Sequence, residues 1–186
     1  LDEDDSLEIT RFLRAVDVRI DGFRVEKAPE WRGQRVFVKH EVDGKGYELR
    51  LSEESAGTQK LMGLASFLLA ALERGGTVVV DELDAKLHPK LLRYVILLFK
   101  DPEVNKSGAQ LIFSSQDVST MRNDVFRRDE IWFAARGEGE ASQLWSLADI
   151  HEANGNLVSK NAAFDKQYLS GRYGADPYLT RIEEWD

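Results

Sequence analysis

Hydrophobic and polar residues alternate over two stretches in the first third of the chain, which predicts β-strands. The alternation is clear over residues 35–42 and 47–51, and Asp43-Gly44-Lys45-Gly46 between them is a strong turn signal. These two stretches are therefore predicted to pair as a hairpin. A weaker alternation over residues 20–25 predicts a further strand, and residues 9–13 predict a short helix.

The pattern changes at Ser55 from a repeat of two residues to one of about three and a half, which predicts a helix. Its wide apolar stripe indicates a mostly buried helix, and Gly75-Gly76 is predicted to end it. Residues 77–80, Thr-Val-Val-Val, are apolar on both faces, as expected for a central parallel strand.

A second helix is predicted to begin at His88-Pro89, because proline fits the first helical turn, and to end at Asp101-Pro102. Residues 109–114 predict the strand that follows it. The order strand, helix, strand is typical of a right-handed parallel crossover.

A last hairpin is predicted from residues 130–135 and 143–147, with Gly137-Glu138-Gly139 as its turn. The tail after His151 is polar but contains several aromatic residues, which we expect to pack against the rest of the chain rather than to bind a partner. These residues are Phe164, Tyr168, Tyr173, Tyr178 and Trp185.

The composition is that of a protein with a real core, since 42% of its 186 residues are hydrophobic and 31% are charged. No stretch approaches the roughly 20 apolar residues of a membrane helix and no signal peptide occurs, so we expect a cytoplasmic protein with no membrane partner. The absence of cysteine excludes disulfides and thiolate metal sites. A net charge of −8 argues against a general attraction to nucleic acid, and a local basic patch stays open.

Two adjacent carboxylates, Asp81 and Glu82, directly follow the apolar run. The carboxyl ends of strands are where ligands bind in open α/β sheets. Because neighbouring strand residues point to opposite sides, the two acids are expected to do different jobs. The plain alternative is a strand that ends in a solvated acidic turn.

A second candidate element, Ser55-Ala56-Gly57-Thr58-Gln59, opens the predicted helix. Ser55 and Thr58 have small hydroxyl side chains, and Gly57 permits close backbone approach. The free amides and the positive dipole end of a helix suit a phosphate. An ordinary Ser/Thr helix cap is the common alternative, and the acid-tipped strand downstream is what favours the phosphate interpretation.

Together the two elements resemble the signature helix and the Walker B strand of ABC-type ATPases, a group that includes SMC-like proteins. The usual signature reads Leu-Ser-Gly-Gly-Gln; here Glu54 replaces the leucine and Ala56 the first glycine. The resemblance implies that Asp81 helps to hold Mg²⁺ and that Glu82 orients or polarises the attacking water. It also implies that residues 55–59 face the γ-phosphate of an ATP held by an opposite subunit.

The same resemblance gives roles to two further residues. Leu83-Asp84-Ala85-Lys86-Leu87-His88-Pro89 looks like the loop that crosses the ABC dimer interface, which makes Asp84 a nucleotide-site candidate, although Asp is also common at caps and turns. Gln116 stands where these ATPases usually carry a histidine that contacts the γ-phosphate. Glutamine can donate a hydrogen bond to phosphate but cannot shuttle a proton, so this departure bears on the rate of hydrolysis.

The implied fold class is α/β: the carboxy-terminal lobe of a P-loop NTPase-like ABC ATPase, with a mostly parallel sheet flanked by helices and an added antiparallel hairpin. We expect one lobe over residues 1–186, made of a β-rich first segment (1–51), the signature helix, Walker B strand and switch strand (52–120), and a hairpin with the tail (121–186). No Gly-x-x-x-x-Gly-Lys-Ser/Thr phosphate loop occurs in the sequence. The Walker A lobe is therefore expected to be missing, and the chain, which begins with Leu1, to be a fragment or a processed product.

A closer resemblance, over most of the chain from Val36 onward, is to prokaryotic AAA-family ATP-binding proteins, stand-alone ABC-like ATPases often linked to phage defence. It rests on residues 53–59, 81–84, 128–133 and 168–175. It implies ATP and Mg²⁺ as cofactors, a homodimer formed through ATP, and a driven effector, frequently a nuclease. ATP hydrolysis is expected only when the chain is combined with its amino-terminal Walker A lobe.

Two other functions stay open on the sequence. One is a nucleotide-sensing switch with little hydrolysis, which Gln116 suggests. The other is a metal-dependent nuclease that uses Asp81, Glu82 and Asp84 as an acidic cluster, since two-metal sites use such carboxylates. The nuclease hypothesis leaves the signature-like helix start unexplained.

Overall fold

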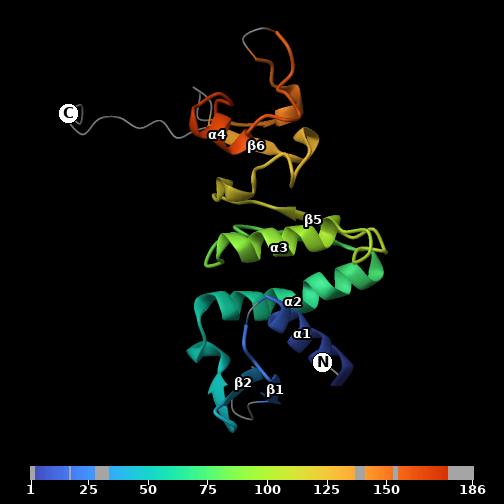
Figure 1. The fold of residues 1–186 in the computed structure, drawn as a ribbon, viewed down its shortest axis with the longest axis vertical. Helices are drawn as coiled ribbons and strands as arrows, with labels where there is room; N and C mark the ends of the chain where they lie inside the picture. Colours follow the sequence, from blue (N-terminus) through green and yellow to red (C-terminus); the bar gives the residue numbers. More distant parts are fainter. Residues whose placement is uncertain (1–2, 17, 28–33, 137–140, 153–154, 176–186) are drawn as a thin grey trace, which may run out of the picture. The chain divides into compact units, whose positions relative to one another are not determined.

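The computed structural model describes residues 3–16, 18–27, 34–136, 141–152 and 155–175 (Figure 1). They form two compact units, which divide between Gln116 and Asp117. The first unit contains, in chain order, α1 (Glu3–Ala15), β1 (Gly22–Lys27), β2 (Gln34–Val42), β3 (Lys45–Arg50), α2 (Ala56–Arg74), β4 (Thr77–Val80), α3 (Pro89–Lys100) and β5 (Gln110–Phe113). The second contains β6 (Trp132–Arg136), β7 (Ser142–Ser146) and α4 (Phe164–Leu169).

The three strands after α1 form an antiparallel sheet of order β1-β2-β3. The predicted hairpin is confirmed, and its turn is the pair Asp43 and Gly44, because Val42 already pairs with Lys45. The short helix predicted over residues 9–13 is the middle of the longer α1. Its buried side chains recur at helical spacing and place one apolar face of α1 against α2. The apolar ones are Ile9, Phe12 and Leu13, and Thr10 is buried beside them.

Helix α2 begins and ends where the sequence predicts. The Ser55 hydroxyl caps it by accepting the N–H of Thr58 at 3.1 Å. Gly75 ends it in the left-handed conformation, with φ 80°, and donates its N–H to the carbonyl of Ala71. In Figure 1 this helix lies between α1 with the antiparallel sheet on one side and α3 with β5 on the other, so it forms the centre of the unit.

The predicted parallel crossover is confirmed, since β4 and β5 pair in parallel and α3 joins them. This establishes an α/β fold, while the other strands of the described part pair antiparallel. Among the described residues of the first unit, one face of the two strands is covered, because α2 and α3 both pack on the side of Val78. On the opposite face Val79 and its partner Ile112 are 73% and 56% exposed. The burial on both faces expected for a central strand is therefore not reached within the described residues.

The second unit is built on the antiparallel pair β6–β7. Its predicted turn, Gly137-Glu138-Gly139, lies outside the described residues, as do Tyr178 and Trp185. The tail aromatics that are described pack inward, as expected: the ring of Phe133 stacks on Tyr168 with centroids 5.7 Å apart. The buried core residues of this unit are Ile131, Phe133, Leu147, Val158, Phe164 and Tyr173.

Tyr173 shows how closely this second core is packed. Its side chain is 4% exposed, and its hydroxyl donates to Gln167 Oε1 at 2.6 Å. Burial raises the pKa of Tyr173 to about 12, so the hydroxyl keeps its proton and its donor role at neutral pH. Among the described residues, no helix is both long and apolar enough to cross a bilayer.

Candidate functional site

The ladder between β4 and β5 gains one extra residue where β4 ends. The N–H of Ser114 donates to the carbonyl of Val80 at 3.1 Å, after which regular parallel pairing would bring the N–H of Glu82 to the Ser114 carbonyl. Leu83 makes that bond instead, at 3.0 Å. Glu82 is thus the inserted residue, and its φ of 50° lies in the left-handed region. Such backbone conformations cost about 1–3 kcal/mol for non-glycine residues and cluster at functional sites.

Asp81 and Glu82 do not continue the strand, which ends at Val80. Strand alternation therefore does not separate the two side chains, contrary to the expectation from the sequence. The two residues differ instead in how they bond to Ser114, Asp81 through its carboxylate and Glu82 through its backbone. The Ser114 hydroxyl donates to Asp81 Oδ1 and accepts the backbone N–H of Glu82 at 2.8 Å. Both acidic residues are exposed, so both carboxylates are accessible to a ligand.

The segment Ser55–Gln59 forms the cap and first turn of α2. The hydroxyls of Ser55 and Thr58 lie 2.9 Å apart, and the Gln59 side-chain amide donates to the Glu54 carbonyl at 2.8 Å. The plain helix-cap explanation therefore holds for Ser55. The cap still leaves N–H groups of the segment available, because the first N–H groups of a helix have no partner within the helix and can bind an anion. Ser55 and Ala56 are exposed, Gly57 is half-buried and Thr58 is buried.

The residues after β4, 81–87, form a turn that we call the acidic loop, and it lies against the start of α2. A Cβ atom on Gly57 would lie 2.9 Å from the backbone carbonyl oxygen of Lys86, so only glycine leaves room for the loop at this point. The ammonium group of Lys60, one turn further along α2, donates to the backbone carbonyl of Glu82. The two elements that the sequence singled out are therefore in direct contact.

Asp84 and Gln116 meet at the same edge of the sheet. The backbone N–H of Gln116 donates to Asp84 Oδ2 at 3.3 Å, and the Gln116 residue is exposed. The other carboxylate oxygen, Asp84 Oδ1, is buried and has no hydrogen-bond partner in the described part of the chain. Within that part, no three His, Asp or Glu side chains gather as metal ligands. Asp81 and Asp84 instead bond to different groups, which does not support the joint acidic cluster of the nuclease hypothesis.

Sequence reasoning missed three contributors to this site. Ser114 directly follows β5 and lies beside Asp81, a position that follows from the pairing of Val80 with Phe113. Lys60 directly follows the signature-like segment; burial lowers the pKa of its ammonium group, and the carboxylates of Asp84 and Glu82 oppose that effect. Neither residue carries a sequence signal until the strand pairing is known.

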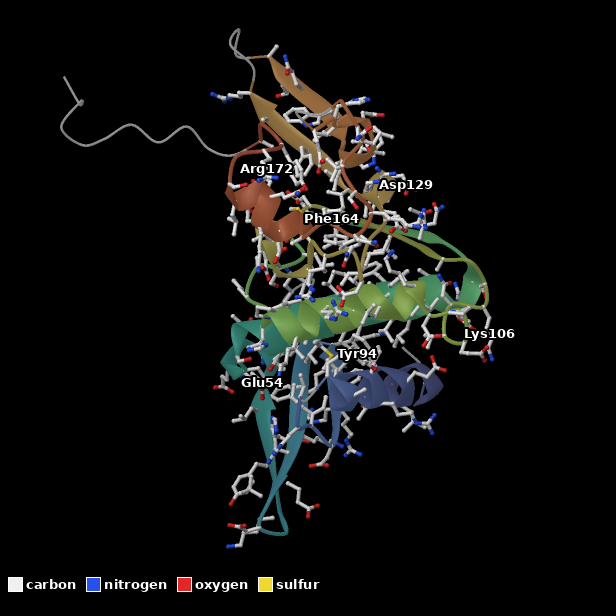
Figure 2. The ribbon with its side chains drawn as sticks, turned by 45° about the horizontal axis from the view of Figure 1, so that its top comes forward. Glu54, Tyr94, Lys106, Asp129, Phe164 and Arg172 are labelled. Atoms are coloured by element: carbon white, nitrogen blue, oxygen red, sulfur yellow. The ribbon has the colours of Figure 1, made fainter. Side chains whose placement is uncertain are left out.

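The third contributor, His40, explains the glutamate that stands in place of the usual leucine. His40 Nε2 lies 2.7 Å from Glu54 Oε1, and His40 Nδ1 lies 2.9 Å from the carbonyl of Arg19. The two side chains are 20% and 11% exposed. Strand β2 is thereby tied to the residue that precedes the cap of α2; Figure 2 labels Glu54.

We expect His40→Ala to lower the free energy of unfolding by about 1–3 kcal/mol, because it leaves a partly buried Glu54 carboxylate without its donor. Urea unfolding followed by circular dichroism measures this loss. Glu73→Ala is the matched control, since the Glu73–Arg74 pair is more than 70% exposed on both sides and should change stability by less than about 0.5 kcal/mol. Equal small effects of both substitutions would contradict a structural role of the His40–Glu54 link.

Residues 2–122 match the model of a protein family described as "AAA domain, putative AbiEii toxin, Type IV TA system". The chain belongs to this AAA-domain family. The resemblance to AAA-family ATP-binding proteins drawn from the sequence is thereby confirmed, and ATP-binding NTPase activity is the general property of such domains. The match includes the signature-like segment, the acidic loop and Gln116, so the site described above lies inside the AAA domain.

Two further comparisons set the chain against curated proteins and solved structures. No curated protein matches the chain. A solved structure described as "Structural biochemistry of ATP-driven dimerization and DNA stimulated activation of SMC ATPases" matches at 17% identity and a TM-score of 0.46, over 74% of this chain and 88% of that chain. So low a TM-score does not by itself establish a shared fold, and the α/β class rests on the pairing of β4 with β5.

Proposed function

We propose that this chain is the carboxy-terminal lobe of an ATPase head that dimerises around ATP and drives a partner or attached effector in phage defence. The observation that carries the proposal is the contact of the acidic loop with the start of α2, through Gly57 and Lys60. This contact fixes the carboxylates, which would act on the triphosphate of their own head, relative to the helix start, which would face the triphosphate of the opposite head.

Within that arrangement the carboxylates of Asp81 and Glu82 would have different roles. Asp81 is exposed and oriented by Ser114, and it would take part in holding Mg²⁺. The ion suits this position because it binds through one or two carboxylates together with phosphate oxygens and waters. The carboxylate of Glu82, whose backbone lies in the left-handed region, would orient the attacking water. The ion's charge would offset the charge that develops on the transferred phosphate.

The open sheet face supports a missing phosphate-binding lobe. Val79 and Ile112 lie directly opposite each other and are largely exposed, on strands that carry the acidic loop and Gln116 at their carboxyl ends. Apolar side chains at the centre of a parallel pair are normally covered on both faces. A Walker A lobe that covers this face would bring its phosphate loop to the edge where the acidic residues lie.

Asp84 lies at the edge of the sheet where the proposed head dimer would form. Its Oδ1 is buried without a partner in the described part of the chain, which costs free energy. A role of Asp84 in dimerisation is supported by the resemblance to ABC-type ATPases, in which this loop crosses the dimer interface. Gln116 would contact the γ-phosphate through its exposed amide. Because an amide does not shuttle protons, we expect slow hydrolysis.

Calorimetric titration with MgATP tests the proposal. We expect the full-length protein, in which the Walker A lobe is present, to bind MgATP with micromolar affinity. The 186-residue chain alone should bind at least about a hundredfold more weakly, because most phosphate contacts of P-loop enzymes come from the phosphate loop. Micromolar binding by the isolated chain, or a full-length protein without a phosphate loop, would refute the lobe assignment.

A further inference from the structure

We propose that Lys60 is a positioning residue of the acidic loop: from helix α2 it holds the backbone of Glu82 and thereby sets the direction of the Glu82 carboxylate. The proposal rests on the function proposed above and adds to it a residue that lies outside the signature-like segment and outside the acidic pair.

One face of helix α2 meets the backbone of the acidic loop. Gly57 and Lys60 stand three residues apart on α2, so they lie on one face of the helix. Both lie against the backbone of the acidic loop. Gly57 lies next to the carbonyl of Lys86, and the Lys60 ammonium donates to the carbonyl of Glu82. The loop thus passes close to this face of the helix at Gly57 and is hydrogen-bonded to it at Lys60. Only the Lys60 contact involves a charged donor, which makes a stronger hydrogen bond than a neutral one.

The backbone at Glu82 is held by the groups around it. Its φ of 50° is unfavourable for a residue with a Cβ, so the surrounding contacts must hold it there. The N–H of Glu82 is held by the Ser114 hydroxyl. Its carbonyl accepts the Lys60 ammonium as well as the N–H of Ala85, at 3.0 Å. Removal of the ammonium leaves the carbonyl side of this peptide with one neutral donor, the N–H of Ala85.

The charge of Lys60 also acts on the acidic loop. Lys60 is half-buried, and both Asp84 and Glu82 act on its charge, while Lys86 opposes them. An ammonium group in this place neutralises part of the negative charge that the acidic loop concentrates. Its attraction to the Asp84 and Glu82 carboxylates adds an electrostatic link between α2 and the acidic loop. Lys60 therefore supports Glu82 through the backbone and through charge.

The test uses the full-length protein and compares Lys60→Met, which keeps most of the side-chain stem, with Lys60→Arg, which restores a charged donor. We expect Lys60→Met to lower kcat about tenfold or more with little change in KM for ATP, because a small misplacement of a catalytic group is costly. Lys60→Arg should recover most of the loss. Lys90→Ala, an exposed lysine at the start of α3, is the control and should keep wild-type turnover.

A double substitution separates positioning from general damage. If Lys60 acts through Glu82, Lys60→Met should cause no further loss once Glu82 is glutamine. Hydrogen exchange provides a readout that needs no activity: the amides of the acidic loop should exchange faster in Lys60→Met, while those of β5 stay protected.

The outcomes decide the two proposals separately. Wild-type turnover in Glu82→Gln would remove the proposed role of Glu82, and loop exchange would then still decide whether Lys60 holds the loop. Unchanged exchange in Lys60→Met overturns the Lys60 proposal whatever the activity. So does an additive loss in the double variant, or turnover within twofold of wild type where Glu82→Gln abolishes it.

Discussion

Glutamine in place of Glu82 is expected to lower ATP turnover of the full-length protein by about a hundredfold or more while ATP binding is retained. The amide has nearly the shape of the carboxylate, so the inserted backbone geometry should survive. It cannot accept a proton from the attacking water, and general-base catalysis contributes about 10²–10⁴ in rate. Phosphate release in a single turnover measures the chemical step, and calorimetry measures the binding.

The same substitution should also change the oligomeric state. If ATP joins two heads and hydrolysis separates them, a variant that binds ATP without hydrolysing it accumulates as the dimer. Light scattering with and without MgATP measures this shift. Glu103→Gln, an exposed acid beyond α3, is the control and should behave as wild type. Wild-type turnover in Glu82→Gln would show that another group orients the water.

Alanine in place of Gly57 is expected to reduce turnover about tenfold or more. Its Cβ would meet the Lys86 carbonyl oxygen at 2.9 Å, and this oxygen belongs to backbone in the left-handed region, with φ 65° at Lys86. The loop must then move away from α2 and carry Glu82 with it. Such displacements of catalytic groups cost up to about a hundredfold in rate.

Gly63→Ala is the matched control in the same helix. A Cβ on Gly63 meets no atom within 4 Å, so this change should only raise helix propensity and stabilise the protein by about 0.5–1 kcal/mol. Thermal unfolding and steady-state turnover of both variants distinguish the two effects. A stabilised Gly57→Ala with normal turnover would show that the contact between loop and helix does not matter for catalysis.

Local sequence signals were sufficient to predict the elements whose ends they define. Ser55 and Gly75 bound α2 as their side-chain chemistry predicts, and Pro89 opens α3. The turn at Asp43 and Gly44 sets the register of its hairpin. The candidate residues were also proposed from the sequence, because the acid-tipped strand and the helix start resemble those of ABC-type ATPases. They are Asp81, Glu82, Asp84, Gln116 and Ser55–Gln59.

Caps, turns and hydrophobic periodicity act over a few neighbouring residues, so the sequence alone was enough to predict α2, α3, the β2–β3 hairpin and the strands β4 and β5. The fold was needed to show that Glu82 is an inserted residue, that Lys60 reaches its carbonyl, and that the face of Val79 and Ile112 is open among the described residues. Each of these depends on pairing between β4 and β5 or on packing of α2 against the acidic loop. Contacts between residues more than 20 positions apart leave no periodic mark in the chain, and only the packed fold brings them together.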